Sequence, residues 1–135
     1  MADLKLFMVI LGAVPPGRHT EQHDVFFGIG PDLASLKNAM QEFWSGVKIH
    51  IDSWREISIV NGYKLNITER TELQETVSPD DVKLFFINLG GYKPEDMEEY
   101  HYKVISATKD KSAAIAEAKA TTFFKHTGFK GARSH

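Results

Sequence analysis

The sequence predicts an α+β protein built from duplicated strand–strand–helix units. The first observation is an internal repeat: residues 5–12, KLFMVILG, align without gaps with residues 83–90, KLFFINLG. At the same spacing Glu21 matches Glu99, and His23 matches His101. The second observation is that both aligned blocks are apolar at consecutive positions, as in strands that are buried on two faces. A repeat at constant spacing indicates an ancient duplication.

The duplication sets the expected organisation of the chain. Residues 1–135 are expected to form a single domain of two internal copies, about 4–52 and 82–135, of which the second is incomplete. The copies are expected to share one mixed sheet with helices on one face. Residues 53–81 supply a β-hairpin and the connector between the copies.

The first copy begins with a predicted strand at 4–11, a loop at 12–22 and a second strand at 24–29. A helix is expected after Pro31, because proline suits the first helical turn. Gly46 is expected to end this helix, and a third strand follows at 48–52. The apolar side chains that recur on one face of the helix are Leu33, Leu36, Met40, Phe43 and Trp44.

The middle of the chain carries a hairpin signal. Asn61-Gly62 lies between possible strands at 54–60 and 63–67, and both turn residues tolerate a positive φ. The connector at 68–81 is polar, with a short helix expected at 69–75. In the second copy we expect strands at 82–89 and 99–107, and an alanine-rich helix at 112–124. The basic tail stops where the first copy has its third strand, with His135 in the place of His50.

The composition excludes several classes of protein. The chain has 135 residues, a net charge of -2 and no cysteine. Disulfide frameworks and thiolate zinc sites are therefore excluded, and a reducing, cytoplasmic compartment is expected. The near-balanced charge argues against a protein that coats nucleic acid or an anionic membrane. Because helices cover only one face of the expected sheet, the hairpin or a second subunit must cover the other, and we predict a homodimer.

Histidine and carboxylate side chains are the remaining candidates for chemistry. His50 and Asp52 share one face of a strand, and an aspartate so placed can orient an imidazole or bind the same metal ion. A separate metal hypothesis combines His19, His23 and Asp24. The competing interpretation is that each histidine is a structural residue bonded to backbone. The candidate binding residues, expected to line a groove between the two copies, are His23, His50, Asp52, Trp54, Arg55 and His101.

Other motifs carry weaker hypotheses. Gly28-Ile29-Gly30 follows a strand and precedes a helix, where a phosphate can bind, but a tight turn explains it as well. The acidic run from Glu95 to Glu99 can bind a hard cation, or it can be a solvated loop.

Four segments resemble a bacterial family, the domain-of-unknown-function family fifteen-forty-three. They are HTEQHDVFFG at 19–28, HIDSWRE at 50–56, NLGGY at 88–92 and EYHYKV at 99–104. The resemblance implies small bacterial proteins with one or two copies of the domain. It brings no activity, cofactor or catalytic residue.

The sequence leaves two functional hypotheses open. The first is a module that binds a small molecule or a protein partner in the groove lined by histidine and aspartate, since no complete catalytic motif is present. The alternative is a histidine- or metal-dependent hydrolase or phosphoesterase. No organic cofactor is expected, and a metal ion is left open. Nucleic-acid binding through the basic tail, with Lys125, Lys130 and Arg133, ranks last.

Overall fold

The computed structural model describes residues 3–70, 80–120 and 133–134. The chain divides into two compact units, which we describe separately. Unit 1 comprises Met1–Ile59 and Lys64–Glu72, and unit 2 comprises Val60–Tyr63 and Leu73–His135. Mixed helices and antiparallel strands make this an α+β protein, as the sequence predicts. The expected single domain stays a prediction.

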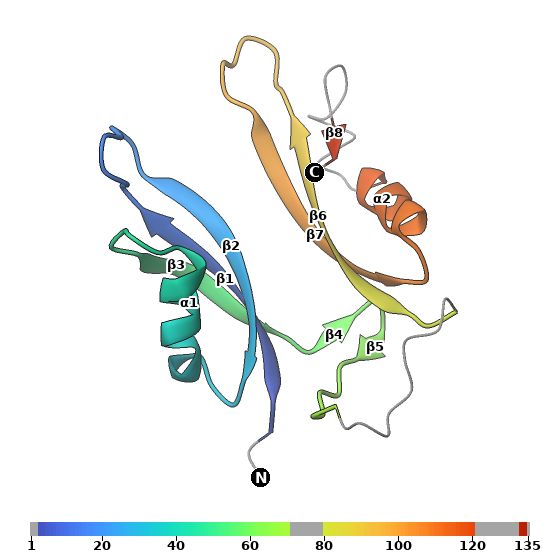
Figure 1. Cartoon of the computed structure of the whole chain (residues 1–135). Helices are drawn as coiled ribbons and strands as arrows, with labels where there is room; N and C mark the ends of the chain where they lie inside the picture. Colours follow the sequence, from blue (N-terminus) through green and yellow to red (C-terminus); the bar gives the residue numbers. More distant parts are fainter. Residues whose placement is uncertain (1–2, 71–79, 121–132, 135) are drawn as a thin grey trace. The chain divides into compact units, whose positions relative to one another are not determined.

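Unit 1 is a three-stranded antiparallel sheet with helical turns on one face (Figure 1). Its strands are β1 (Lys5–Ala13), β2 (Gln22–Gly30) and β3 (His50–Ile57), in the order β2-β1-β3. A short 3-10 helix, η1 (Ala34–Leu36), and α1 (Lys37–Phe43) connect β2 to β3. The Asp32 carboxylate accepts a hydrogen bond from the Ser35 backbone N–H at 2.8 Å and so stabilises the first helical turn.

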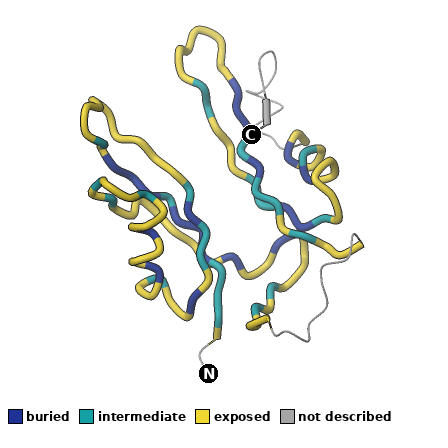
Figure 2. The backbone as a smooth tube through the Cα atoms, viewed as in Figure 1, coloured by how far each residue is buried: buried dark blue, intermediate teal, exposed yellow. Residues whose placement is uncertain are grey.

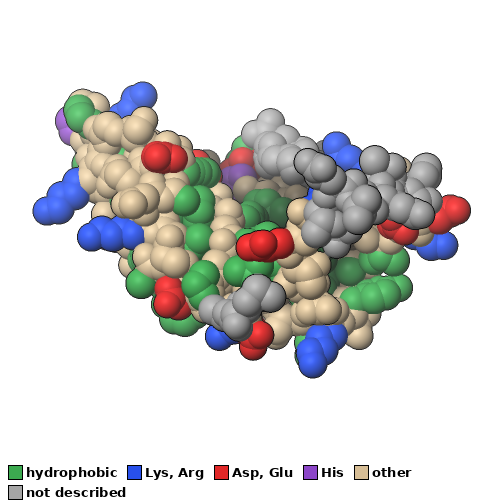
Figure 3. Space-filling model, turned by 60° about the horizontal axis from the view of Figure 1, so that its bottom comes forward, with side chains coloured by type: hydrophobic (Ala, Val, Ile, Leu, Met, Phe, Trp, Pro, Cys, Tyr) green, Lys and Arg blue, Asp and Glu red, His purple; other side chains and the backbone are tan. Residues whose placement is uncertain are grey.

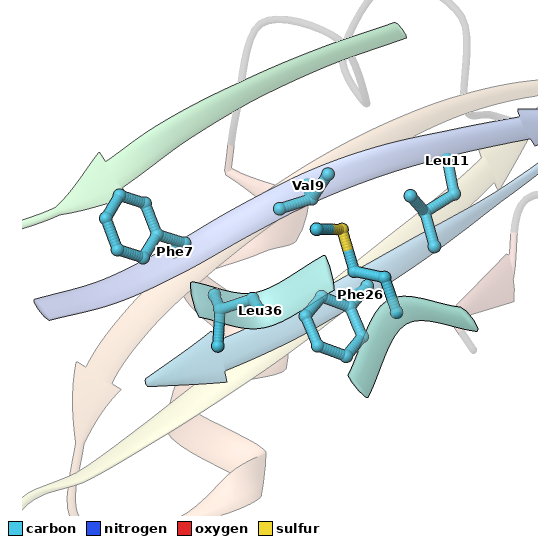
Figure 4. Close-up of a cluster of buried hydrophobic side chains, with 6 residues drawn as sticks. Phe7, Val9, Leu11, Phe26 and Leu36 are labelled. Carbon is cyan, nitrogen blue, oxygen red and sulfur yellow. The ribbon is translucent and has the colours of Figure 1, made fainter. Parts of the chain in front are cut away.

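The core of unit 1 lies between the sheet and these helices (Figure 4). Alternate residues of a strand point to opposite faces, so the odd-numbered residues of β1 face the helices. They pack with Phe26 from β2 and with Leu36 and Met40 from the helical turns. The buried members of this cluster are Phe7, Val9, Leu11, Phe26, Leu36 and Met40.

Strand β3 is longer than the sequence predicts. It runs on from His50 through residues that were expected to begin the hairpin, because β1 offers pairing partners as far as Leu6, opposite Ile57. The register shifts at a β-bulge between Ile10 and Leu11, which pair with Ser53 and Ile51. The residue left over in the bulge is Asp52.

The predicted hairpin turn is confirmed, although its arms are short. Asn61 and Gly62 have φ values of 51° and 80°, the positive values that this turn requires. The strands on either side, β4 (Ile59–Val60) and β5 (Tyr63–Lys64), have two residues each. The helix expected at 69–75 lies mostly outside the described residues, and its first two residues are not helical.

Unit 2 contains a second antiparallel sheet of three strands. Strands β6 (Lys83–Gly91) and β7 (Tyr100–Thr108) pair along their whole length, and β8 (Arg133–Ser134) pairs with the other edge of β6. Helix α2 (Lys111–Lys119) packs on this sheet and begins at Asp110, whose carboxylate accepts a hydrogen bond from Ala113 N–H at 2.8 Å. Its buried alanines, Ala114 and Ala118, allow the close approach expected from the sequence.

The expectation of one mixed sheet shared by both copies needs correction. The described strands form separate antiparallel sheets, and each central strand is paired on both sides by strands of its own unit. Both edges of β1 and β6 are therefore occupied, and neither can pair across the units. Buried residues concentrate on these two central strands (Figure 2).

Candidate functional site

The candidate site lies where β1 ends, on the face of the unit 1 sheet opposite α1. Gly12 pairs with His23 of β2 on one side and with His50 of β3 on the other. The two histidines therefore flank a glycine in one row across three strands. Leu11, the preceding residue, points into the core beneath α1, so Gly12 and its neighbours in the row belong to the other face.

Four side chains meet above Gly12: Glu21, His23, His50 and Asp52. The Nε2 atom of His23 lies 2.6 Å from Asp52 Oδ2 and 3.2 Å from Glu21 Oε2. The Nε2 atom of His50 lies 2.8 Å from Asp52 Oδ1 and also contacts Glu21 Oε1. Each carboxylate thus presents one oxygen to each imidazole. We call these four residues the His/carboxylate cluster.

Gly12 provides the space in which the cluster assembles. A Cβ atom at this position would lie 2.7 Å from His50 Nε2, 2.9 Å from Glu21 Oε1 and 3.0 Å from Asp52 Oδ2. Any larger residue would therefore displace three of the four side chains. The backbone of Gly12 has no positive φ, so close approach, rather than conformational freedom, explains the glycine.

The sequence-based pairing of His50 with Asp52 is supported by the contact between their side chains. Glu21 was not among the predicted site residues and entered only as the match of Glu99 in the repeat. A signal was available: Glu21 and His23 are two residues apart, as are Glu99 and His101, and residues so spaced share one face of a strand. The position of Gly12 between His23 and His50 follows only from the strand register.

The remaining candidates lie away from the cluster. Trp54 packs edge-on against Phe7 on the α1 face, with ring centroids 5.9 Å apart. Arg55 pairs with Met8, farther along the sheet from Gly12. Asp24 pairs with Leu11, and its carboxylate accepts a hydrogen bond from Val25 N–H at 2.8 Å. His19 is exposed in the loop before β2, and the set His19, His23 and Asp24 does not converge as ligands in the described part of the chain.

Unit 2 repeats part of this arrangement. His101 pairs with Gly90, and its Nε2 atom lies 3.2 Å from Glu99 Oε1. A Cβ atom on Gly90 would meet the Glu99 carboxylate, as one on Gly12 would meet Glu21. On the β8 side Gly90 pairs with Arg133, whereas Gly12 pairs with His50. His135, the expected counterpart of His50, lies outside the described residues, and the groove expected between the copies stays a prediction.

Comparison with known proteins finds a family model that is similar to part of the chain. Residues 18–67 match the model described as Domain of Unknown Function (DUF1543), which confirms the resemblance seen in the sequence. Residues 18–67 are similar to the DUF1543 domain. The match spans β2, α1 and β3 and therefore includes all four residues of the His/carboxylate cluster. No curated protein matches the chain.

The fold is similar to that of a solved structure. The crystal structure of a protein Il1583 from Idiomarina loihiensis matches with a TM-score of 0.64 and 21% sequence identity, over 98% of this chain and 79% of that chain. At this identity the likeness shows the fold alone. Within the described residues, no helix has the length and apolar character to cross a membrane.

The donor atoms of the His/carboxylate cluster suit a cation. Glu21, His50 and Asp52 each offer one ligand atom, and these atoms lie within 4.8 Å of one another. Imidazole nitrogen and carboxylate oxygen are ligands for zinc and for other divalent first-row metals. Elsewhere the charge is mixed: on the face in Figure 3, the described acidic and basic side chains are interspersed.

Proposed function

We propose that this protein is a binding module for a divalent first-row metal ion, held by the His/carboxylate cluster of unit 1. The observation that carries the proposal is the convergence of two imidazoles and two carboxylates above Gly12. Glu21, His50 and Asp52 supply the three ligand atoms that lie close together. His23 contacts the second oxygen of each carboxylate and orients them, as groups behind metal ligands do.

Hydrogen bonding within the cluster leaves its oxygens incompletely satisfied. The Nε2 atom of an imidazole carries at most one proton, yet the Nε2 of His50 faces an oxygen of Glu21 and an oxygen of Asp52. One N–H cannot point directly at both oxygens. A divalent metal ion bound between His50 Nε2 and one oxygen each of Glu21 and Asp52 would be coordinated by all three atoms, and its charge would balance those of the two carboxylates.

The ligand set also narrows the kind of metal. Imidazole favours zinc, copper, iron and nickel, whereas sites made of oxygen alone favour magnesium and calcium. The sequence has no cysteine, so soft thiolate coordination is excluded. Zinc is the ion that we propose, because it accepts nitrogen and oxygen ligands in one small site.

We further infer that units 1 and 2 are copies of one ancestral unit. The register of β1 with β2 starts at the pair Lys5 and Gly30, and that of β6 with β7 starts at the pair Lys83 and Thr108. Both residues of the second pair lie at the same distance along the sequence from their counterparts in the first pair. The same offset relates Gly12 to Gly90 and His23 to His101. In both units the first strand is central, which also supports the inference.

Titration of the whole chain with zinc tests the proposed function. Protein that carries no histidine tag is treated with a chelator, and zinc binding is then measured by isothermal titration calorimetry. We expect the wild type to bind one zinc ion tightly per chain. The zinc affinity should fall sharply in His50→Ala and in Asp52→Asn. His19→Gln removes an exposed histidine outside the cluster and should bind like the wild type. Absence of binding by the wild type, or equal binding by all variants, would refute the proposal.

A hydrolase is the second candidate, because the contacts of His23 and His50 with Asp52 bring two imidazoles into one site, where they could serve as acid and base. His101 belongs to unit 2, so its part in such a site stays a prediction. Zinc-loaded protein should then cleave bis(p-nitrophenyl) phosphate at a rate that His23→Ala abolishes. A rate no greater than that of free zinc would reject this candidate.

A further inference from the structure

We propose that the metal ion in the His/carboxylate cluster keeps one coordination position open toward solvent and binds an anionic oxygen donor there, a carboxylate or a phosphate. This inference rests on the proposed function. It deepens that function by naming the class of ligand that the bound ion recognises.

The cluster approaches an ion from one side only. Gly12, His23 and His50 form one row of the sheet, and Asp52 projects from the same face. The backbone at Gly12 blocks the side of the cluster nearest the sheet. The side chains lie so close to it that a Cβ atom at this position would contact His50, Glu21 and Asp52. Protein ligands therefore occupy the hemisphere nearest the sheet, and the opposite hemisphere has no ligand from the cluster.

The exposure of the side chains agrees with this one-sided arrangement. The side chains of His50, Glu21 and Asp52 are 51%, 38% and 32% exposed. Structural zinc sites are closed by four protein ligands, whereas sites with three protein ligands keep a position for water or another ligand. In unit 2, by contrast, the Glu99 side chain is only 17% exposed.

The cluster contains three converging ligand atoms rather than four. Glu21 and Asp52 each turn one oxygen to His50 and the other to His23. If His50 and its two oxygens bind the ion, His23 remains beside the outer oxygens as a positioning residue. The three-ligand set Glu21, His50 and Asp52 thus leaves a tetrahedral ion one ligand short.

The charge of the filled site specifies how an anion must bind. Two carboxylates and a divalent ion sum to no net charge, so the site attracts anions weakly at a distance. An anion therefore has to coordinate the ion directly and displace its water. This requirement selects oxygen donors that coordinate well, such as carboxylate and phosphate, over perchlorate.

Cobalt substitution tests the inference by a readout other than activity. Co²⁺ is titrated into the metal-free chain, and its visible absorption reports the number and kind of ligands. Acetate, inorganic phosphate and perchlorate are then added at matched ionic strength. We expect a saturable spectral change with acetate, phosphate or both, and no change with perchlorate. A response to one of the two anions alone identifies the preferred donor.

The outcomes separate this inference from the proposed function. If the Co²⁺ spectrum forms but neither acetate nor phosphate alters it, the open position is refuted and metal binding stands. If no spectrum forms, metal binding fails and the open position fails with it. His23→Gln should weaken metal binding by about 10–100-fold, as loss of an orienting residue does, yet keep the anion response. Loss of the anion response in this variant at saturating Co²⁺ would contradict the assignment of His23.

Discussion

Replacing Gly12 with alanine is expected to abolish tight metal binding without unfolding the protein. The added Cβ atom would lie 2.7 Å from His50 Nε2 and 2.9 Å from Glu21 Oε1, where ordinary contact begins at 3.4 Å. These two ligand atoms must therefore retreat by about 0.5 to 0.7 Å, whereas metal–ligand distances tolerate only about 0.2 Å. We expect zinc affinity to fall by about 100-fold or more, beyond the loss typical of an orienting residue.

The fold itself should tolerate this substitution. Gly12 has no positive φ, and alanine in a strand interior is favoured over glycine by about 0.5–1 kcal/mol. The displaced side chains are exposed and can rotate toward solvent. The free energy of unfolding of the metal-free protein should therefore change by no more than about 1 kcal/mol.

Calorimetric zinc titration, together with urea denaturation of the metal-free chain, measures both effects. Gly90→Ala is the matched control, because its Cβ atom meets the Glu99 carboxylate in unit 2 and leaves the cluster of unit 1 untouched. We expect this control to bind zinc like the wild type. If Gly12→Ala also binds zinc with unchanged affinity, the role assigned to this glycine is wrong.

Three further predictions concern stability, titration and assembly. The Asn88 side-chain oxygen is buried without a hydrogen-bond partner among the described residues, and its counterpart in unit 1 is Ile10. Asn88→Ile should therefore raise the free energy of unfolding, measured by urea denaturation, by about 1–3 kcal/mol. No change, or a loss of stability, would contradict this. The hydrogen bond that the Tyr100 hydroxyl donates to Asp96 at 2.9 Å raises the pKa of Tyr100 above 10.0, so tyrosinate absorbance should appear at lower pH in Asp96→Asn. An unchanged titration curve would exclude this cause. Ile51 and Trp54 are exposed on the edge strand β3, which supports the predicted homodimer. Light scattering after size-exclusion chromatography should give twice the mass of the chain. A monomer at micromolar protein concentration would argue against the dimer.

Much of the local structure could be predicted because it depends on nearby residues. The turn at Asn61-Gly62 follows from the tolerance of both residues for positive φ, and α2 follows from its alanines. Strand β1 was predicted nearly to its ends by its apolar run. The continuity of β3 was not predicted: residues 48–52 and 54–60 were expected in separate strands, and their joining through Ser53 depends on pairing with β1.

The site was predicted in part for the same reason. The His50–Asp52 contact follows from the two-residue period of a strand, and it was anticipated. Glu21 and Gly12 were missed, since their role depends on which strands lie beside one another. The set His19, His23 and Asp24 stays a prediction; Asp24 and His23 are adjacent in β2 and so face opposite sides of the sheet.

The sequence by itself determined which residue types are available for chemistry: without cysteine, metal binding must use histidine and carboxylate. It also determined the repeated spacing of Gly12, Glu21 and His23 in Gly90, Glu99 and His101. Only the tertiary structure decided that His23 and His50 flank Gly12, because residues far apart in the chain become neighbours through strand register. It also decided that each unit has a sheet of its own, in which β1 or β6 is paired on both edges by strands of the same unit.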